Sequence, residues 1–152
     1  FRKGMIYEDP TVYINCTSVC KPDDAPDGAM NWFTMINVPN NQGQDWDQLI
    51  AKARKDILAK LSRLLHADIE GLIDFEEILD PRSIEFKTSS AQGALYGNSS
   101  NTRFAAFLRH PNFSSQLKNL YFCGGSVHPG GGIPLALLSA KIMAEDIPDL
   151  KK

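Results

Sequence analysis

Residues 120–134 read LYFCGGSVHPGGGIP and lead into the apolar sequence LALLSAK of residues 135–141. The short apolar run that opens this stretch is typical of a strand buried on both faces of a parallel sheet. Five glycines follow, and Pro134 suits the first position of a helix. A strand, a glycine loop and a helix N-terminus together bring backbone N–H groups close to a ligand. The stretch therefore predicts a site for a flat or phosphorylated ligand.

The N-terminal third predicts two antiparallel strands. Residues 12–16 are β-branched and aromatic, which favours a strand. Residues 21–28 contain prolines, aspartates and a glycine without an apolar pattern, so they predict a turn or loop. Residues 30–38 then predict a second strand that pairs with the first.

The middle of the chain predicts one long helix. Apolar residues recur at three- and four-residue steps over residues 44–66, and such a stripe predicts a helix that packs on the core rather than on a membrane. Residues 72–79 predict an edge strand, and Asp80 and Pro81 predict the N-cap and first residue of a short helix to about Lys87. The polar residues 88–102 predict a loop.

Composition excludes several classes of function. The net charge of −2, without a basic cluster, argues against nucleic-acid binding. No apolar run is long enough for a membrane span. Three cysteines, Cys16, Cys20 and Cys123, are an odd number, which argues against a disulfide framework and for a reducing, cytoplasmic compartment. The alternative is that Cys16 and Cys20 form half of a zinc site, which His128 or Cys123 completes. Buried or half-buried thiols without a metal are expected.

Several segments closely resemble the C-terminal portion of the carotenoid (phytoene) desaturases and dehydrogenases, a family of FAD-dependent oxidoreductases that includes retinoid relatives. The specific element is GGSVHPGGGIP in residues 124–134. Supporting elements are DPTVYI in residues 9–14, APDG in residues 25–28, GALYG in residues 93–97 and RHPN in residues 109–112. The resemblance implies an FAD oxidoreductase that desaturates or saturates C–C bonds of a carotenoid by hydride transfer to or from flavin.

The resemblance also implies roles for individual residues. Gly124 and Gly125 are expected along the ribityl-diphosphate part of FAD, and Gly131, Gly132, Ile133 and Pro134 near the isoalloxazine ring. Tyr96 and Arg109 are weaker candidates to face the flavin or the apolar polyene substrate. His128 is a weak candidate for an acid or base, because the pKa of histidine suits neutral pH.

The dinucleotide-binding sequence Gly-x-Gly-x-x-Gly, expected after a first strand in such flavoproteins, does not occur in these residues. We therefore expect the C-terminal piece of a longer protein, inactive by itself because the N-terminal FAD-binding half is missing. The expected fold class is α+β, a fragment of a two-domain FAD oxidoreductase. Residues 1–117 supply part of the antiparallel substrate-domain sheet with a long helix, and residues 118–152 supply the last strand and helix of the FAD-binding domain.

An apolar polyene dissolves in lipid, so the parent protein is expected to work in the cytoplasm at the surface of a membrane. The competing hypothesis is a self-contained, non-catalytic binding domain whose glycine loop captures an anion or a partner. That domain would dock its terminal helix on its own core, whereas a flavoprotein fragment would leave the helix without its sheet.

Overall fold

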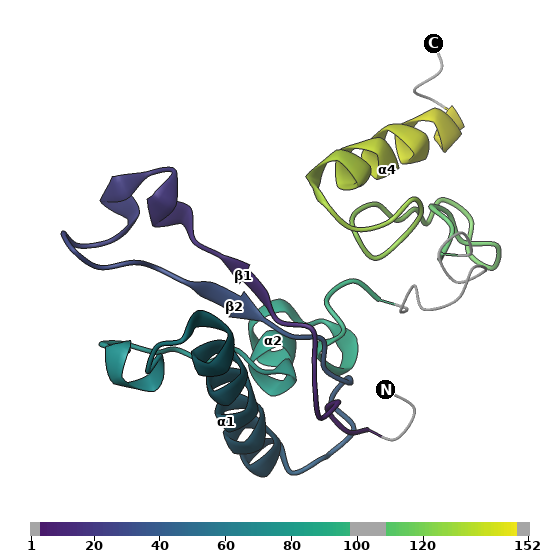
Figure 1. Cartoon of the computed structure of the whole chain (residues 1–152). Coiled ribbons are helices and arrows are strands. Elements are labelled where there is room, and N and C mark those ends of the chain that lie inside the picture. Colours follow the sequence, from purple (N-terminus) through teal and green to yellow (C-terminus); the bar gives the residue numbers. More distant parts are fainter. Residues whose placement is uncertain (1–3, 98–108, 149–152) are drawn as a thin grey trace. The chain divides into compact units, whose positions relative to one another are not determined.

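A computed structural model of the chain describes residues 4–97 and 109–148. The chain divides into two compact units, Phe1–Asp80 and Pro81–Lys152, which are described one at a time. Between them they contain a two-stranded antiparallel sheet and several helices (Figure 1). The predicted α+β class is confirmed at this level. The predicted assignment of residues 1–117 and 118–152 to two domains of a parent protein stays a prediction.

In the first unit, β1 (Tyr13–Asn15) pairs antiparallel with β2 (Phe33–Met35), with Tyr13 opposite Met35 (Figure 1). The two predicted strands are thus confirmed in place and direction, although each is only three residues long. The connection between them is folded into two short 3₁₀ turns, Thr17–Val19 and Pro22–Asp24.

The side chain of Asn31 holds the first of these turns. Its Nδ2 donates to Thr17 Oγ1 at 2.6 Å, and its Oδ1 accepts from the backbone N–H of Ser18 at 2.9 Å. Because the Asn31 amide binds both a donor and an acceptor on the turn, the backbone folds into the turn there. The pairing of β1 with β2 therefore ends at Asn15.

The long helix α1 spans Trp46–Leu65 and confirms the prediction for residues 44–66. Asp45 caps its first turn by accepting from Gln48 N at 3.1 Å, which satisfies one of the unpaired N–H groups at a helix start. At the other end His66 adopts the left-handed conformation, with φ 52°, and terminates the helix.

Only part of the apolar stripe on α1 is buried. Trp46 and Leu61 lie in the core of this unit, together with Ile69 just beyond the helix. Leu64 and Leu65 are exposed, so the predicted core packing is confirmed for Trp46 and Leu61 and wrong for the last turn. The chain turns back at His66 and returns along one side of the helix, where Ile69 N donates to Ser62 Oγ at 3.1 Å.

The predicted edge strand over residues 72–79 is wrong. A 3₁₀ turn, Glu70–Leu72, is followed by irregular chain up to Asp80. Arg54 of α1 donates to Glu70 at 2.7 Å and to Glu76 at 2.9 Å, so charged side chains, rather than a neighbouring strand, hold this segment. Phe75 between them is 83% exposed.

In the second unit, α2 (Pro81–Thr88) begins at Pro81 as predicted. A 3₁₀ turn, Ala91–Gly93, follows in the polar loop predicted for residues 88–102, and the last part of that loop lies outside the described residues. The terminal helix α4 (Ile133–Asp146) confirms the helix predicted after the glycine loop, with Pro134 at its second position rather than its first.

The predicted buried strand at residues 120–123 is wrong. Two isolated bridges replace it, Phe113 with Tyr121 and His110 with Val127. A strand of a parallel sheet needs strands on both sides to pair its N–H and C=O groups. Among the described residues of this unit, only the segment around residues 110–114 pairs with it.

The cysteine side chains are more accessible than predicted. Cys16 is half-buried, as expected, whereas Cys20 and Cys123 are exposed, and all three are free thiols. Cys123 is exposed because the run of residues 120–123 lacks the sheet that would bury it.

Candidate functional site

The glycine loop of residues 124–132 depends on backbone conformations that favour glycine. Gly124, Gly130 and Gly132 have φ values of 122°, 136° and 98°, where a side chain would be strained. Gly132 is also the N-cap of α4, so the last glycine of the loop turns the chain directly into the helix.

Tyr96 packs on this loop. A Cβ atom built on Gly131 would lie 2.6 Å from Cδ1 of the Tyr96 ring, and one built on Gly125 would lie 3.7 Å from the same atom. These two glycines therefore let the aromatic ring approach the backbone closely. The ring itself stays largely exposed.

Arg109 packs beside Tyr96. Its Nη1 donates to the carbonyl oxygen of Tyr96 at 3.0 Å, and its Nε would lie 2.9 Å from a Cβ atom built on Gly130. The structure thus brings Tyr96 and Arg109 together with the glycine loop, three groups that the sequence analysis had proposed separately.

Two further hydrogen bonds attach the loop to neighbouring chain. Ser126 Oγ donates to the carbonyl oxygen of Leu95 at 3.2 Å, and the N–H of His128 donates to the carbonyl oxygen of His110 at 2.9 Å. His128 precedes a cis peptide bond to Pro129. His128 is exposed, and its role as an acid or base stays a prediction.

A buried polar pair beneath the loop was missed by the sequence analysis. Asn112 is 3% exposed and Ser139 is 0% exposed, and Asn112 Nδ2 donates to Ser139 Oγ at 2.8 Å. The same hydroxyl oxygen accepts from the N–H of Gly124 at 3.1 Å. One signal was present in the sequence, since Ser139 is a polar residue within an otherwise apolar run.

The residues at the start of α4 fit a flat, electron-rich ring such as that of a flavin. A Cβ atom built on Gly124 or Gly132 would meet nothing within 4 Å, so both glycines leave space beside the backbone. The N–H groups of Ile133 and Leu135 are in the first turn, where a helix provides no acceptor. No acidic side chain lies in that turn, and the positive end of the helix dipole lies there.

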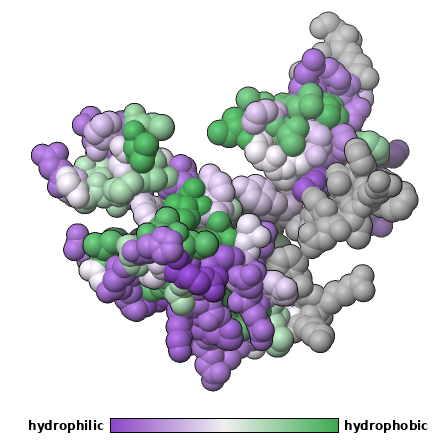
Figure 2. Space-filling model, in the orientation of Figure 1, coloured by the Kyte–Doolittle hydropathy of each residue, from purple (hydrophilic) through white to green (hydrophobic). Residues whose placement is uncertain are grey.

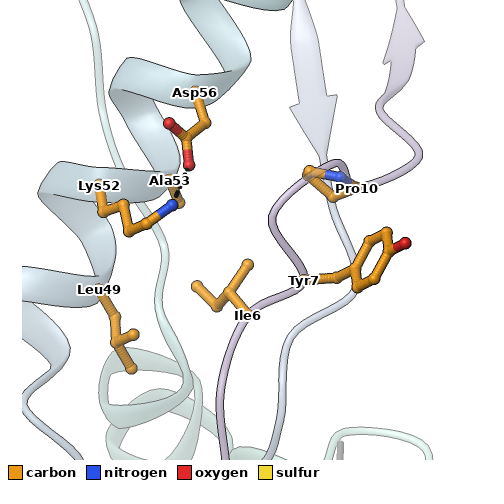
Figure 3. A pocket seen from close by; sticks show the side chains of 7 residues that line it. All are labelled: Ile6, Tyr7, Pro10, Leu49, Lys52, Ala53 and Asp56. Carbon is orange, nitrogen blue, oxygen red and sulfur yellow. Dashed lines mark hydrogen bonds and ion pairs between the residues drawn. The ribbon is translucent and has the colours of Figure 1, made fainter.

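A separate small pocket lies in the first unit between α1 and the chain that leads into β1 (Figure 3). Ile6, Tyr7 and Pro10 line it on one side, with the Tyr7 ring turned away from α1, and Leu49, Ala53 and the ion pair of Lys52 and Asp56 line it on the other (Figure 3). Its volume of about 20 Å³ is room for about one water molecule. This pocket is therefore too small for a polyene.

The described part of the chain contains neither a metal-binding cluster nor a membrane-spanning helix. Residues 4–97 and 109–148 contain no group of three or more His, Cys, Asp or Glu side chains placed to hold a metal ion. Within the same ranges, every helix is too short or too polar to cross a bilayer.

Comparison with known proteins agrees with the sequence resemblance. No family model matches the chain. It is 60% identical over 149 residues to a 1-hydroxycarotenoid 3,4-desaturase of a Flavobacterium species, a match that covers 98% of this chain and 30% of the relative.

More distant relatives bear a different name. A 4,4'-diaponeurosporene oxygenase of Staphylococcus aureus is 34% identical over 97% of the chain, and that of Staphylococcus haemolyticus is 32% identical over 99%. Each match again covers 30% of the relative. Over the residues that it spans, the chain therefore belongs with the carotenoid desaturase-like proteins, and it spans about 30% of the length of these relatives.

Proposed function

We propose that this chain is the C-terminal part of an FAD-dependent oxidoreductase that desaturates or saturates C–C bonds of a carotenoid or a related polyisoprenoid. The names of the relatives, a carotenoid desaturase and a diaponeurosporene oxygenase, support the class of substrate and of reaction. The observation that carries the proposal is the open space at Gly132, where the glycine loop meets the first N–H groups of α4.

FAD supplies the hydride chemistry when it is bound, and the residues of this chain hold and orient it. Gly124 and Gly125 would lie along its ribityl-diphosphate part. Gly131, Gly132, Ile133 and Pro134 would lie by the ring, where the N–H groups that open α4 stabilise negative charge. The diphosphate-binding half lies in the rest of the parent protein, so this chain alone is expected to be inactive.

In this proposal, Tyr96 and Arg109 form the substrate side of the site. Tyr96 offers an exposed aromatic face above Gly125 and Gly131, and Arg109 holds the backbone of Tyr96 in place. A ring of this kind packs well against a flat polyene. Because such a substrate dissolves in lipid, we place the parent protein in the cytoplasm in peripheral contact with a membrane.

The competing function, a self-contained binding domain, requires α4 to pack on the core of this chain. Among the residues that the structure describes in α4, only Ser139 is buried, whereas Ile133 is 79% exposed and Leu137 is 68% exposed. The hydrophobic surface on α4 is visible in Figure 2. Within the second unit, most apolar side chains of α4 are therefore left without a cover, and exposed apolar surface marks a contact with other protein elements, which supports the oxidoreductase.

The proposal is tested on the full-length protein that contains these residues. Bound FAD is measured by its visible absorbance, and conversion of a carotenoid is followed by chromatography. Replacing Gly132 by Ala strains the backbone and fills the space beside the helix start, so FAD affinity is expected to fall about tenfold. Gly43→Ala is the matched control, because Gly43 has a φ of 83° and open space but lies in the first unit.

The proposed function would be contradicted if the purified full-length protein contained no FAD and did not bind FAD that is added to it. Equal loss of FAD from Gly132→Ala and Gly43→Ala would instead refute the position of the cofactor at the start of α4.

A further inference from the structure

Asn112 and Ser139 are almost completely buried, yet neither belongs to the predicted cofactor contacts. They are the buried polar side chains of the glycine-loop region. A buried hydroxyl and a buried amide are retained at little cost only when they are hydrogen-bonded. Here each of them binds the other and also binds backbone on a different segment.

The bonds join the start of the glycine loop to α4. Asn112 Nδ2 donates to Ser139 Oγ at 2.8 Å and to the carbonyl oxygen of Phe122 at 3.1 Å. Ser139 Oγ accepts in addition from Gly124 N at 3.1 Å. Since Ser139 belongs to α4, the start of the loop is bonded to the helix into which the loop later runs.

A backbone pair strengthens the same connection. The N–H of Phe122 donates to the carbonyl oxygen of Asn112 at 2.8 Å. The N–H of Gly124 points to the buried hydroxyl of Ser139. The left-handed φ of Gly124, 122°, sets the direction in which the chain continues into Gly125. The distance between Gly124 and the helix start at Gly132 is set by this buried pair and not by the loop residues alone.

We propose that Asn112 and Ser139 are positioning residues, which hold the glycine loop on α4 so that both ends of the loop meet one flavin. This inference rests on the proposed function. The chemical reason is that a cofactor which touches residues at both ends of a loop binds tightly only if those ends are already the right distance apart. Removing the Ser139 hydroxyl takes away the acceptor that the Gly124 N–H and the Asn112 amide share. Gly124 is then no longer bonded to α4 through this hydroxyl.

The test uses the full-length protein with Ser139→Ala and Asn112→Ala, and measures the dissociation constant for FAD and the flavin midpoint potential. Loss of the Ser139 hydroxyl, or of the Asn112 amide that donates to it, is expected to weaken FAD binding about tenfold and to shift the potential. Ser139→Thr keeps the hydroxyl and is expected to recover most of the affinity. If Ser139→Ala does not fold, Ser139→Cys, which replaces the hydroxyl by a thiol that accepts hydrogen bonds only weakly, takes its place.

Asn31→Ala is the matched control, because Asn31 likewise ties a hydroxyl and a backbone N–H together, but in the first unit. Thermal unfolding of the FAD-free proteins gives the purely structural effect of each variant. An Asn112→Ala protein that is destabilised as much as Asn31→Ala, yet keeps its FAD affinity and potential, would overturn this inference while leaving the proposed function intact. Absence of FAD from the unaltered protein would refute the proposed function itself.

Discussion

Asp9 and Lys60 form an ion pair that ties the chain before β1 to α1. Lys60 Nζ lies 2.8 Å from Asp9 Oδ1 and also donates to the carbonyl oxygen of Pro10 at 2.7 Å. The hydrogen bond from Lys60, followed by its charge, lowers the pKa of Asp9 below its ordinary value of 3.8. The DPTVYI segment is therefore held to the helix by one lysine that binds a carboxylate and a carbonyl together.

Replacing Lys60 by Gln is expected to bring the pKa of Asp9 back toward 3.8. Because the folded-state pKa is the lower one, the ionised carboxylate stabilises the fold above pH 3.8, and this contribution is lost as the pH falls through the folded pKa. The unaltered chain should thus lose more stability in that acidic range than Lys60→Gln. The carboxyl titration is followed by NMR.

Lys52→Gln serves as the control for this titration, because Lys52 pairs with Asp56 at 2.6 Å and has no bond to Asp9. A pKa of Asp9 that is the same in Lys60→Gln and in the unaltered chain would show that the ion pair does not form in solution.

At the scale of elements, the 3₁₀ turn Ala91–Gly93 folds back on the beginning of α2. Gly93 has a φ of 70°. A Cβ atom built on Gly93 would overlap main-chain atoms of Pro81 and would lie 2.8 Å from the Cα atom of Pro81. Main-chain atoms at a helix start cannot move aside as a flexible side chain can. The close approach of this turn to α2 therefore requires glycine.

Gly93→Ala is expected to destabilise the chain by about 2–4 kcal/mol, from overpacking and backbone strain together. Gly43→Ala, which meets no atom within 4 Å, adds only the strain and should cost about 1 kcal/mol. Both values are measured by chemical unfolding followed by circular dichroism. Equal losses would show that the turn does not pack on Pro81 in solution.

In the whole molecule, each of the two units leaves many large apolar side chains of its described residues exposed. Trp46, Leu61 and Ile69 are the buried hydrophobic residues of the described ranges. Figure 2 shows hydrophobic residues on the visible surface, some of them on α4. Leu137 of α4 is 68% exposed. Exposed apolar surface of this kind is typical of a chain whose partner elements lie elsewhere in the protein.

This exposure predicts unequal protection of the two long helices. In this chain, the amides of residues 135–144 should exchange with solvent faster than those in the middle of α1, because a helix opens more easily when few of its side chains are buried. Hydrogen exchange read by mass spectrometry measures both helices in one sample. Protection of α4 equal to or above that of α1 would support a self-contained domain and weaken the oxidoreductase proposal.

The helices and the family could be predicted from the amino-acid sequence. A helix bonds within its own segment, so the apolar period of α1, the start of α2 at Pro81 and the start of α4 near Pro134 could all be predicted locally. The motif in residues 124–134 was specific enough to indicate the carotenoid desaturase-like proteins, which the relatives confirm.

The strands and the buried pair of Asn112 and Ser139 depend instead on contacts between distant segments. A strand forms only where another segment pairs with it, so apolar residues 120–123 and 72–79 predicted strands that did not form. The contact of Tyr96 and Arg109 with the glycine loop, and the bond from Asn112 to Ser139, join residues far apart in the chain. No local pattern specifies such contacts, because they depend on how distant segments pack together.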